Sequence, residues 1–303
     1  MLAVGFDPSF IDTLVRVEDA KGNLVDDIPP LGHHHRQTNI IRVAGGNGVN
    51  ISAILHKLNI DHILVVPSNP EFDILLNKRN IDKVHRIHEQ VNESVGITFH
   101  SGEMQFNDGK HGLSRIDWSE EVHRYWTESP ISLFTNWGLN PTSSDWVSRQ
   151  WLASCGYSFE EISQISDVKS QALQAEGCKT NLLLEPGSII SHKDHGFLLD
   201  LLDHIGSTTF ENQFSIFSAN EEENPEFNKL NFRQSIFHSS SKVILSEGGI
   251  KSTFDVNPLP CTPTTFVGSG DAFIAGLIKG LQEMRLDIDF AIHTAQRFLC
   301  NSF

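Results

Sequence analysis

Near its C-terminus the chain reads Thr265-Phe266-Val267-Gly268-Ser269-Gly270-Asp271-Ala272-Phe273-Ile274-Ala275-Gly276-Leu277. Glycines precede an apolar run with helical spacing, so the stretch predicts a tight turn that opens a helix. The backbone N–H groups of such a turn point the same way, and the helix dipole adds positive charge there, which together make an anion-binding site. Asp271 is also a favoured capping residue, so an ordinary capped helix explains the same pattern.

A second glycine-rich turn, Ala44-Gly45-Gly46-Asn47-Gly48-Val49-Asn50, follows a predicted strand and opens a predicted helix. As a dinucleotide-binding fingerprint it is weak, because Ile51 stands where a third glycine or an alanine belongs. A phosphate-binding P-loop is excluded, because no Gly-Lys-Ser/Thr occurs. A tight strand-to-helix turn capped by asparagine explains the stretch equally well.

Short apolar strands alternate with helical stretches through most of the chain. Strands are predicted at residues 2–6, 12–17, 38–43, 62–67, 84–88, 96–100, 131–135, 181–184, 215–218 and 242–245. Helices are predicted at residues 47–58, 72–79, 143–154, 195–205 and 271–284. The alternation favours a parallel α/β sheet with helices on both faces. We expect a single domain over residues 1–303, with a small second lobe inserted at about 13–43 and 84–115.

Composition excludes several classes of protein. The chain has 303 residues, a formal charge of −15, 39% hydrophobic residues and 20% charged residues, which is enough apolar material for a core. The acidic balance argues against nucleic acid and anionic membranes as partners. No run of about 18 apolar residues predicts a membrane-spanning helix, and we expect no secretory signal.

The four cysteines, Cys155, Cys178, Cys261 and Cys300, are scattered and form no C-x-x-C pair. Their spacing argues against a structural zinc site and against a disulfide framework. We therefore expect a reducing cytoplasm as the location.

The C-terminal turn resembles the signature of the ribokinase-like (PfkB-type) carbohydrate kinases, which is Gly-Ala-Gly-Asp followed by Ala-Phe and small residues. The resemblance implies that Asp271 is the catalytic base, and that Gly268, Ser269 and Gly270 form the anion hole for the transferring phosphate. It also implies a three-layer α/β/α sandwich with a mostly parallel sheet and a small β-sheet lid.

The N-terminal turn is similar to the family's glycine pair followed by two asparagines. The resemblance implies that the phosphoryl-acceptor alcohol is bound by Gly45, Gly46, Asn47 and Asn50. In the family, an aspartate shortly after the first strand holds substrate hydroxyls. Asp12 is the candidate here and Asp7 the runner-up, although an aspartate at a strand end is otherwise a turn residue.

Three further positions are similar to the family's nucleotide site. Asn220 and Glu223 match an Asn-x-x-Glu motif, whose glutamate helps to position Mg²⁺ through water. Three adjacent carboxylates at 221–223 otherwise indicate a solvated helix start. Ser246 and Gly248 match a Thr/Ser-x-Gly motif that contacts the nucleotide. Gln296 stands where some members place an asparagine near the adenine.

The chain also departs from the family pattern. Thr265 and Phe266 replace the usual aspartate and its following residue, so K⁺ activation is not implied. The chain stops at Phe303 without the customary glycine-bearing turn, so we expect one wall of the nucleotide site to be thinner.

Together the motifs imply an ATP- and Mg²⁺-dependent kinase that phosphorylates a hydroxyl of a small sugar or polyol. One alternative is a nucleoside kinase of the same fold, in which a base would stack on Phe10, Phe99, Phe106 or Trp137. The other alternative is a catalytically inactive homologue that binds a sugar or nucleotide. Neither nucleic acid nor membrane is expected as a partner, and a homodimer through the lid stays open.

Overall fold

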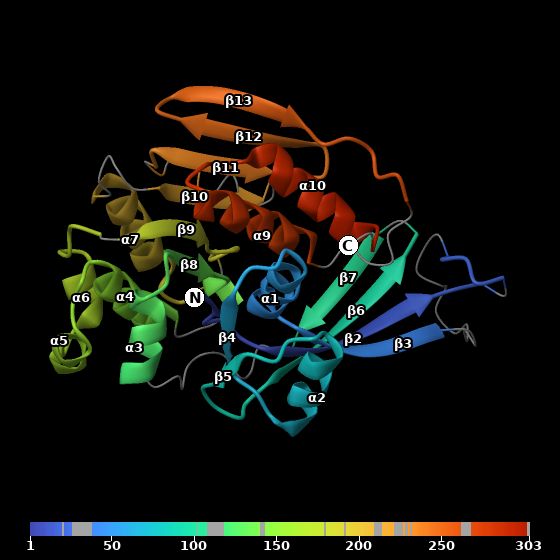
Figure 1. The fold of residues 1–303 in the computed structure, drawn as a ribbon, viewed down its shortest axis with the longest axis horizontal. Helices are drawn as coiled ribbons and strands as arrows, with labels where there is room; N and C mark the ends of the chain where they lie inside the picture. Colours follow the sequence, from blue (N-terminus) through green and yellow to red (C-terminus); the bar gives the residue numbers. More distant parts are fainter. Residues whose placement is uncertain are drawn as a thin grey trace.

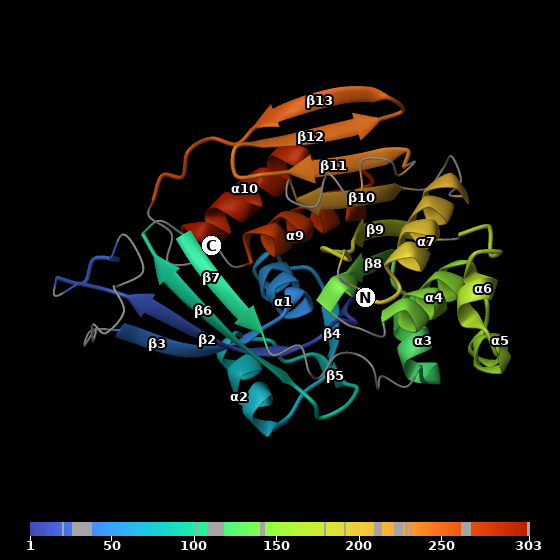
Figure 2. The same cartoon turned by 180° about the vertical axis from the view of Figure 1, so that it is seen from behind.

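The structure is a computed structural model of the chain. It describes residues 1–19, 21–25, 38–100, 102–107, 118–139, 143–178, 180–190, 192–208, 214–220, 227, 230, 232–261 and 268–301. Figures 1 and 2 show a layered α/β sandwich from opposite sides, with a smaller sheet projecting from it.

A mostly parallel sheet runs through the sandwich (Figure 1). One part pairs β1 (Leu2–Gly5), β4 (His62–Val66) and β5 (Val84–Arg86), all parallel. The other part contains, in spatial order, β8 (Ile131–Thr135), β9 (Asn181–Glu185), β10 (Ser215–Asn220), β11 (Gln234–His238), β12 (Lys242–Glu247) and β13 (Ile250–Asp255). Strands β8 to β11 are parallel, whereas β12 and β13 are antiparallel additions at the edge. Strands β1 and β8 lie side by side, and Ala3 N–H donates to Ser129 Oγ at 3.3 Å.

Helices cover both faces of this sheet (Figure 2). On one face α1 (Asn47–Lys57), α9 (Ser269–Gln282) and α10 (Ile288–Leu299) pack together. On the other face lie α3 (Glu120–Thr127), α4 (Ser143–Ser154), α5 (Phe159–Gln164), α6 (Val168–Ala172) and α7 (His195–Thr208). Helix α2 (Pro70–Lys78) packs beside the smaller sheet, and a 3₁₀ turn, η2 (Trp137–Leu139), follows β8.

Two hydrophobic cores lie on opposite faces of the sheet, because side chains alternate along each strand. In β9, Leu183 belongs to the core beneath α1 and α9, while Leu182 and Leu184 belong to the core beneath α4 and α7. Strands buried on both faces read as continuous apolar runs, which is why these strands are visible in the sequence.

The smaller sheet has four strands in the order β3 (Thr38–Gly45), β2 (Phe10–Val17), β6 (Asn92–Phe99) and β7 (Gly102–Asn107). Two antiparallel pairs, β2 with β3 and β6 with β7, are joined by parallel pairing of β2 with β6. Strand β5, predicted within the second inserted segment, pairs with β4 in the main sheet instead. The rest of that segment beyond residue 107 lies outside the described residues.

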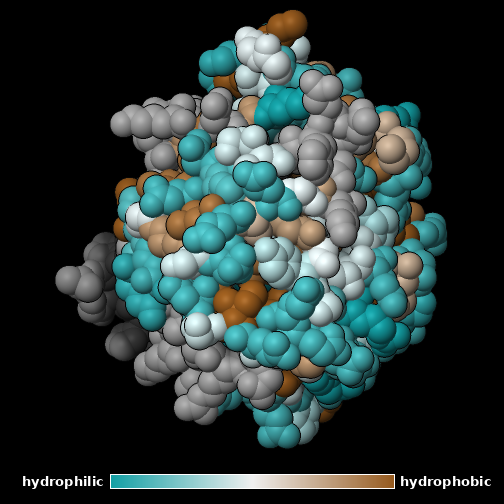
Figure 3. All heavy atoms as spheres, turned by 90° about the vertical axis from the view of Figure 1, so that its left-hand side faces the viewer, coloured by the Kyte–Doolittle hydropathy of each residue, from teal (hydrophilic) through white to brown (hydrophobic). Residues whose placement is uncertain are grey.

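Among the described helices, none combines the length and the apolar character that crossing a membrane requires. Figure 3 views the molecule from the side on which α5, α6 and α7 lie. This face is mostly hydrophilic, with small separate hydrophobic patches.

Candidate functional site

A cavity of about 910 Å³ lies where the smaller sheet meets the carboxyl ends of the central strands. Glu185, Asn220 and His238 are the last residues of β9, β10 and β11, and all three line it. Open α/β sheets bind ligands at this edge. The cavity is also lined by ten of the residues predicted from the sequence: Asp12, Gly46, Asn47, Asn50, Asn220, Gly268, Ser269, Gly270, Asp271 and Gln296.

The predicted anion turn is formed by Gly268 and the start of α9. Gly268 has a left-handed backbone (φ 87°, ψ 4°), which glycine adopts without strain. The helix begins at Ser269, and the first backbone N–H groups of a helix have no partner within it. Gly268, Ser269 and Gly270 all line the cavity, so these groups and the dipole of α9 are available to an anion there.

Asp271 is the third residue of α9 and is not its cap, because Gly268 occupies the capping position without a side-chain bond. The Asp271 side chain is buried and accepts a hydrogen bond from Asn50 Nδ2 at 2.8 Å. Burial raises the pKa of Asp271 to about 7, against the opposing effects of the Asn50 hydrogen bond and the positive charge of Arg79. A carboxyl group that titrates near neutral pH suits a general base.

Asp12 projects into the cavity from β2 of the smaller sheet. Ser94 Oγ on β6 donates to Asp12 Oδ1 at 2.5 Å, which holds the carboxylate in place. Gly45, at the end of β3, lies directly against this carboxylate without lining the cavity. The structure thus brings Asp12 to the cavity, with Gly45 behind it.

The runner-up, Asp7, does not line the cavity. It lies buried behind α1, and its Oδ2 accepts from the Gly48 N–H at 3.0 Å. Burial raises the pKa of Asp7 to about 7, and the nearby Asp271 carboxylate raises it further. We assign Asp7 to the support of α1.

Several asparagine amides line the cavity. Asn47 begins α1, and Asn136, which follows β8, lies with Nδ2 3.5 Å from Asn47 Oδ1. Asn107 reaches the cavity from β7. Asn107, Asn136 and Glu185 were not among the predicted site residues. Each is a polar residue at or directly after the end of a strand, and this position alone could have identified them as candidates.

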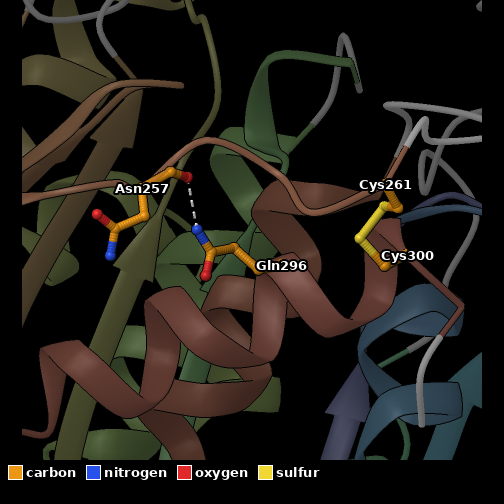
Figure 4. The surroundings of a disulfide bond; sticks show 4 residues. All are labelled: Asn257, Cys261, Gln296 and Cys300. Atoms are coloured by element: carbon orange, nitrogen blue, oxygen red, sulfur yellow. Dashed lines mark hydrogen bonds between the residues drawn. A yellow bond between two sulfur atoms is a disulfide. The ribbon is translucent and has the colours of Figure 1, made fainter.

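Asn220 and Gln296 also line the cavity. Gln296 Nε2 donates to the Asn257 carbonyl oxygen at 2.8 Å, which ties α10 to the segment after β13 (Figure 4). Glu223, Thr265 and Phe266 lie outside the described residues.

Ser246 and Gly248 are not at the cavity, contrary to the prediction. Strand β12 runs antiparallel to β11, and Ser246 pairs with Ser235 near the start of β11, at the far edge of the sheet. The residues that occupy the cavity edge are His238, Ser239 and Ser240. Strand β11, which was not predicted, lies between β10 and β12 and contributes these residues.

His238 is the most unusual of these residues. Its imidazole packs against the Phe273 ring with centroids 5.2 Å apart, and its Cε1 would lie 3.9 Å from a Cβ at Gly270. Burial lowers the pKa of His238 to about 4. Its Nε2 is buried and has no hydrogen-bond partner within the described part of the chain, and His238 lines the cavity beside Gly270.

Cys261 and Cys300 form a disulfide, which corrects the expectation drawn from cysteine spacing (Figure 4). The bond joins the segment after β13 to the residue that follows α10. Its partners are 39 residues apart, so no local spacing pattern announced it. Bonds of this kind persist in oxidising compartments, which weighs against the expected reducing location.

Within the described ranges, no group of three or more His, Cys, Asp or Glu side chains is arranged to hold a metal ion. The cavity edge nevertheless presents the oxygen atoms of Glu185 and Asn220. Hard oxygen donors of this type fit an ion such as Mg²⁺, which keeps waters and takes phosphate oxygens as further ligands.

No family model matches the chain, and no curated protein matches its sequence. Solved structures do match over almost its whole length. A nucleoside kinase from Burkholderia thailandensis in complex with inosine has a TM-score of 0.63 and 11% identity, covering 99% of this chain and 91% of its own. Ribokinase from Arabidopsis thaliana complexed with ribose and ATP has a TM-score of 0.59 and 15% identity, covering 99% and 90%.

Ribokinase from Thermotoga maritima is similar to the same extent, with a TM-score of 0.59 and 13% identity, covering 97% of this chain and 90% of its own. At these identities the likeness concerns the fold. The mostly parallel central sheet, the flanking helices and the smaller sheet correspond to that architecture. The chain therefore has the ribokinase-like fold.

Proposed function

We propose that the protein is an ATP-dependent kinase that transfers the γ-phosphoryl group to a hydroxyl of a small sugar or polyol. The observation that carries the proposal is the position of Asp271, a buried carboxyl at the first turn of α9. It lies beside the glycine turn and shares one cavity with Asp12 and several amides.

The acceptor side suits an alcohol with several hydroxyls. Asp12 accepts hydrogen bonds, and the amides of Asn47, Asn107 and Asn136 both donate and accept. Hydroxyl groups need both kinds of partner. We assign these residues and Asn50 to the acceptor, together with Gly46, whose backbone lines the cavity, and with Gly45, which makes room for the Asp12 carboxylate.

Asp271 orients the attacking hydroxyl and accepts its proton as the new phosphorus–oxygen bond forms. Gly268, Ser269 and Gly270 direct their backbone N–H groups at the transferring phosphoryl group, whose charge they stabilise. Catalysis by positioning and electrostatics is what phosphoryl transfer requires of a protein.

The nucleotide side of the proposal consists of Asn220, His238 and Gln296, all of which line the cavity. Glu185 and Asn220 offer oxygen atoms toward Mg²⁺, which neutralises phosphate charge when it is bound. Glu223 stays a predicted metal residue, acting through water.

A nucleoside acceptor is supported less well. Of the four aromatic residues suggested to stack on a base, Phe10 lines the cavity. Phe99 and Trp137 are buried in the protein, and Phe106 is exposed on β7. Only one of these four suggested stacking residues is at the cavity, whereas Asp12 and several amides there suit hydroxyl groups, so a sugar or polyol remains our proposal.

We also propose a partner protein, which is a second copy of this chain bound through the smaller sheet. Ile40, Val95, Met104 and Phe106 are exposed on the smaller sheet. Strand register places all four on the face opposite Asp12 and Ser94. We assign this face to a second copy of the chain, which light scattering on the wild type and on Phe106→Ser tests.

Neither nucleic acid nor a membrane is a proposed partner, in keeping with the charge of −15. The cytoplasm was the location predicted from the sequence, and the disulfide weighs against it. A thiol count after rapid alkylation in cells tests it, because reduction would free Cys261 and Cys300.

The decisive experiment measures ADP release with Mg·ATP against sugars, polyols, sugar acids and nucleosides. Asp271→Asn should lower turnover by about 10²–10⁴-fold, the usual contribution of a general base, and leave ATP affinity nearly unchanged. Asp61→Asn is the matched control, since Asp61 is exposed and paired with Lys83 away from the cavity. Retained turnover in Asp271→Asn would contradict the assignment of the base. ATP binding with no turnover on any acceptor would support the inactive homologue instead.

A further inference from the structure

We infer that Arg79 is a positioning residue for the catalytic base, because it locks the Asn50 amide in the orientation that donates to Asp271. The inference rests on the proposed function, in which Asp271 is the base. Arg79 does not line the cavity, so it acts on the reaction through Asn50.

The guanidinium of Arg79 connects three parts of the fold. Arg79 follows the last turn of α2, and its Nη1 donates to the Ala44 carbonyl oxygen at 2.6 Å and to Asn50 Oδ1 at 2.8 Å. Ala44 lies in β3, directly before the glycine pair. One side chain therefore holds both the end of β3 and the first turn of α1.

The Asn50 amide lies between a donor and an acceptor that cannot exchange roles. Its Oδ1 accepts from Arg79, and its Nδ2 donates to Asp271 Oδ2 at 2.8 Å. A guanidinium only donates, and an ionised carboxylate only accepts. If the Asn50 amide were flipped, its N–H groups would face the N–H groups of Arg79, and its oxygen would face the carboxylate oxygen of Asp271. Arg79 thus removes one of the two amide orientations.

The locked amide also determines where the carboxylate stands. Asn50 Nδ2 would lie 3.2 Å from a Cβ at Gly268, so the amide is confined beneath the anion turn. Because Asn50 occupies Oδ2 of Asp271, the second carboxylate oxygen is left for the acceptor hydroxyl. A carboxylate held within a few tenths of an ångström is what phosphoryl transfer by positioning demands.

Arg79 further supplies positive charge to an acidic neighbourhood. Three charged groups interact with Asp271, namely the carboxyls of Asp7 and Asp12 and the guanidinium of Arg79, while the Glu185 carboxyl and the His238 imidazole line the same cavity. The Arg79 charge lowers the pKa of Asp271, whereas the Asp12 charge raises it. Without Arg79, Asp271 would be left among carboxylates and would hold its proton to higher pH.

The first test is the pH dependence of kcat in Arg79→Met. Loss of an adjacent guanidinium moves a carboxyl pKa up by about one or more, so the acid limb of the profile should move up by about one pH unit. The loss of kcat should therefore be about tenfold larger at pH 6 than at pH 8.5, with KM for ATP unchanged. Arg79→Lys keeps the charge and should leave the limb near its wild-type position. Arg86→Met is the matched control, because Arg86 pairs with Asp73 at the surface.

The second test does not depend on turnover. Carboxyl-¹³C aspartate labelling allows the titration of Asp271 to be followed by NMR, with the signal identified by its absence in Asp271→Asn. The midpoint should be higher in Arg79→Met than in the wild type. If Arg79→Met does not fold, Asn50→Ala removes the donor to Asp271 while Arg79 remains, and it must move the midpoint of the Asp271 titration in the same direction.

The outcomes separate the inference from the proposed function. In one outcome, the midpoint of the Asp271 titration is higher in Arg79→Met, but the wild type turns over no acceptor. This result would contradict the kinase proposal and still support Arg79 as the residue that sets the pKa of Asp271. In the other outcome, the wild type is an active kinase, and Arg79→Met changes neither the acid limb of the kcat profile nor the midpoint of the Asp271 titration. A kcat that is reduced equally at every pH would then overturn the role of Arg79.

Discussion

The carboxylate of Asp12 fills the space that a side chain at Gly45 would need. A Cβ atom at position 45 would lie 1.7 Å from Asp12 Oδ2. The other carboxylate oxygen is held by Ser94 Oγ, so Asp12 has little freedom to move aside. The glycine that ends β3 is therefore a condition for placing a carboxylate in the cavity.

Gly45→Ala should displace Asp12 and weaken acceptor binding. Loss of a hydrogen bond to a charged group costs about 1.5–3 kcal/mol, so KM for the acceptor should rise about 10- to 150-fold. KM for ATP should stay near its wild-type value, because the displaced group lies on the acceptor side. Steady-state kinetics with each substrate varied in turn checks this. Gly196→Ala on α7 meets no atom within 4 Å and serves as the control. A rise in the ATP KM alone would contradict the assignment of sides.

The two buried carboxyls predict an inverted pH dependence of stability. Burial raises the pKa values of Asp7 and Asp271 to about 7, well above those of an unfolded chain. The folded state therefore binds more protons than the unfolded state between about pH 4 and pH 7, so the free energy of unfolding falls as pH rises through that window. The two groups interact and titrate as a pair.

Urea unfolding between pH 5 and pH 7.5 checks this expectation. Asp7→Asn should flatten the decline, since the amide carries no charge to bury. Asp61→Asn should leave the decline unchanged, because that carboxyl is exposed and the ion pair with Lys83 holds its pKa below the window. A stability that rises with pH over this range would show that both carboxyls ionise at low pH in the folded protein.

The disulfide should affect both the stability of the fold and the binding of the nucleotide. A cross-link that closes a loop of this length restricts the unfolded chain by about 4 kcal/mol, so Cys300→Ser should lower the free energy of unfolding by about 2–4 kcal/mol. The segment after β13 contributes Asn257, Pro258 and Leu259 to the cavity, so KM for ATP should rise while KM for the acceptor is unchanged. Cys178→Ser is the control, because Cys178 is not part of the disulfide and the serine hydroxyl can still donate to the Thr180 carbonyl oxygen, as the Cys178 thiol does. Dithiothreitol should reproduce the effect in the wild type, and its failure to change either quantity would contradict the role of the bond.

His238→Leu should separate binding from stability. Leucine keeps an apolar contact with Phe273 but removes Nε2, so KM for ATP should rise by about 5- to 10-fold, as for the loss of one hydrogen bond. The free energy of unfolding should not fall, because the lost nitrogen has no partner within the described residues. Thermal unfolding and ATP kinetics measure the two effects. Reduced stability with normal kinetics would place His238 in the core alone.

The sequence predicts much of the fold because the central strands are buried on both faces. All predicted strands and helices are present, with ends within four residues of those expected. The elements that were missed lack a continuous apolar run. Strand β13 (Ile250–Asp255) is an exposed edge strand, and β11 (Gln234–His238) has just two apolar residues, Ile236 and Phe237. Helix α10 was detectable, since Ile288, Ala291 and Ile292 are buried at helical spacing.

The candidate site was predictable where a glycine turn and a strand end occur together in sequence. It was not predictable where partners meet only in space. Arg79 and Asn50 are 29 residues apart, and Asn50 and Asp271 are 221 residues apart. An arginine at a helix end is an ordinary surface residue until the fold places an amide beside it.

The bond between Cys261 and Cys300 has a topological consequence. It closes a covalent ring that contains the anion turn, Asp271 and the whole of α9 and α10. A protease that cuts once inside this ring opens it without releasing a fragment. In the oxidised protein, the helix that carries Asp271 thus stays covalently joined to the sheet after any single cleavage within the ring, through the uncut peptide chain or through the disulfide, and only reduction lets the pieces part.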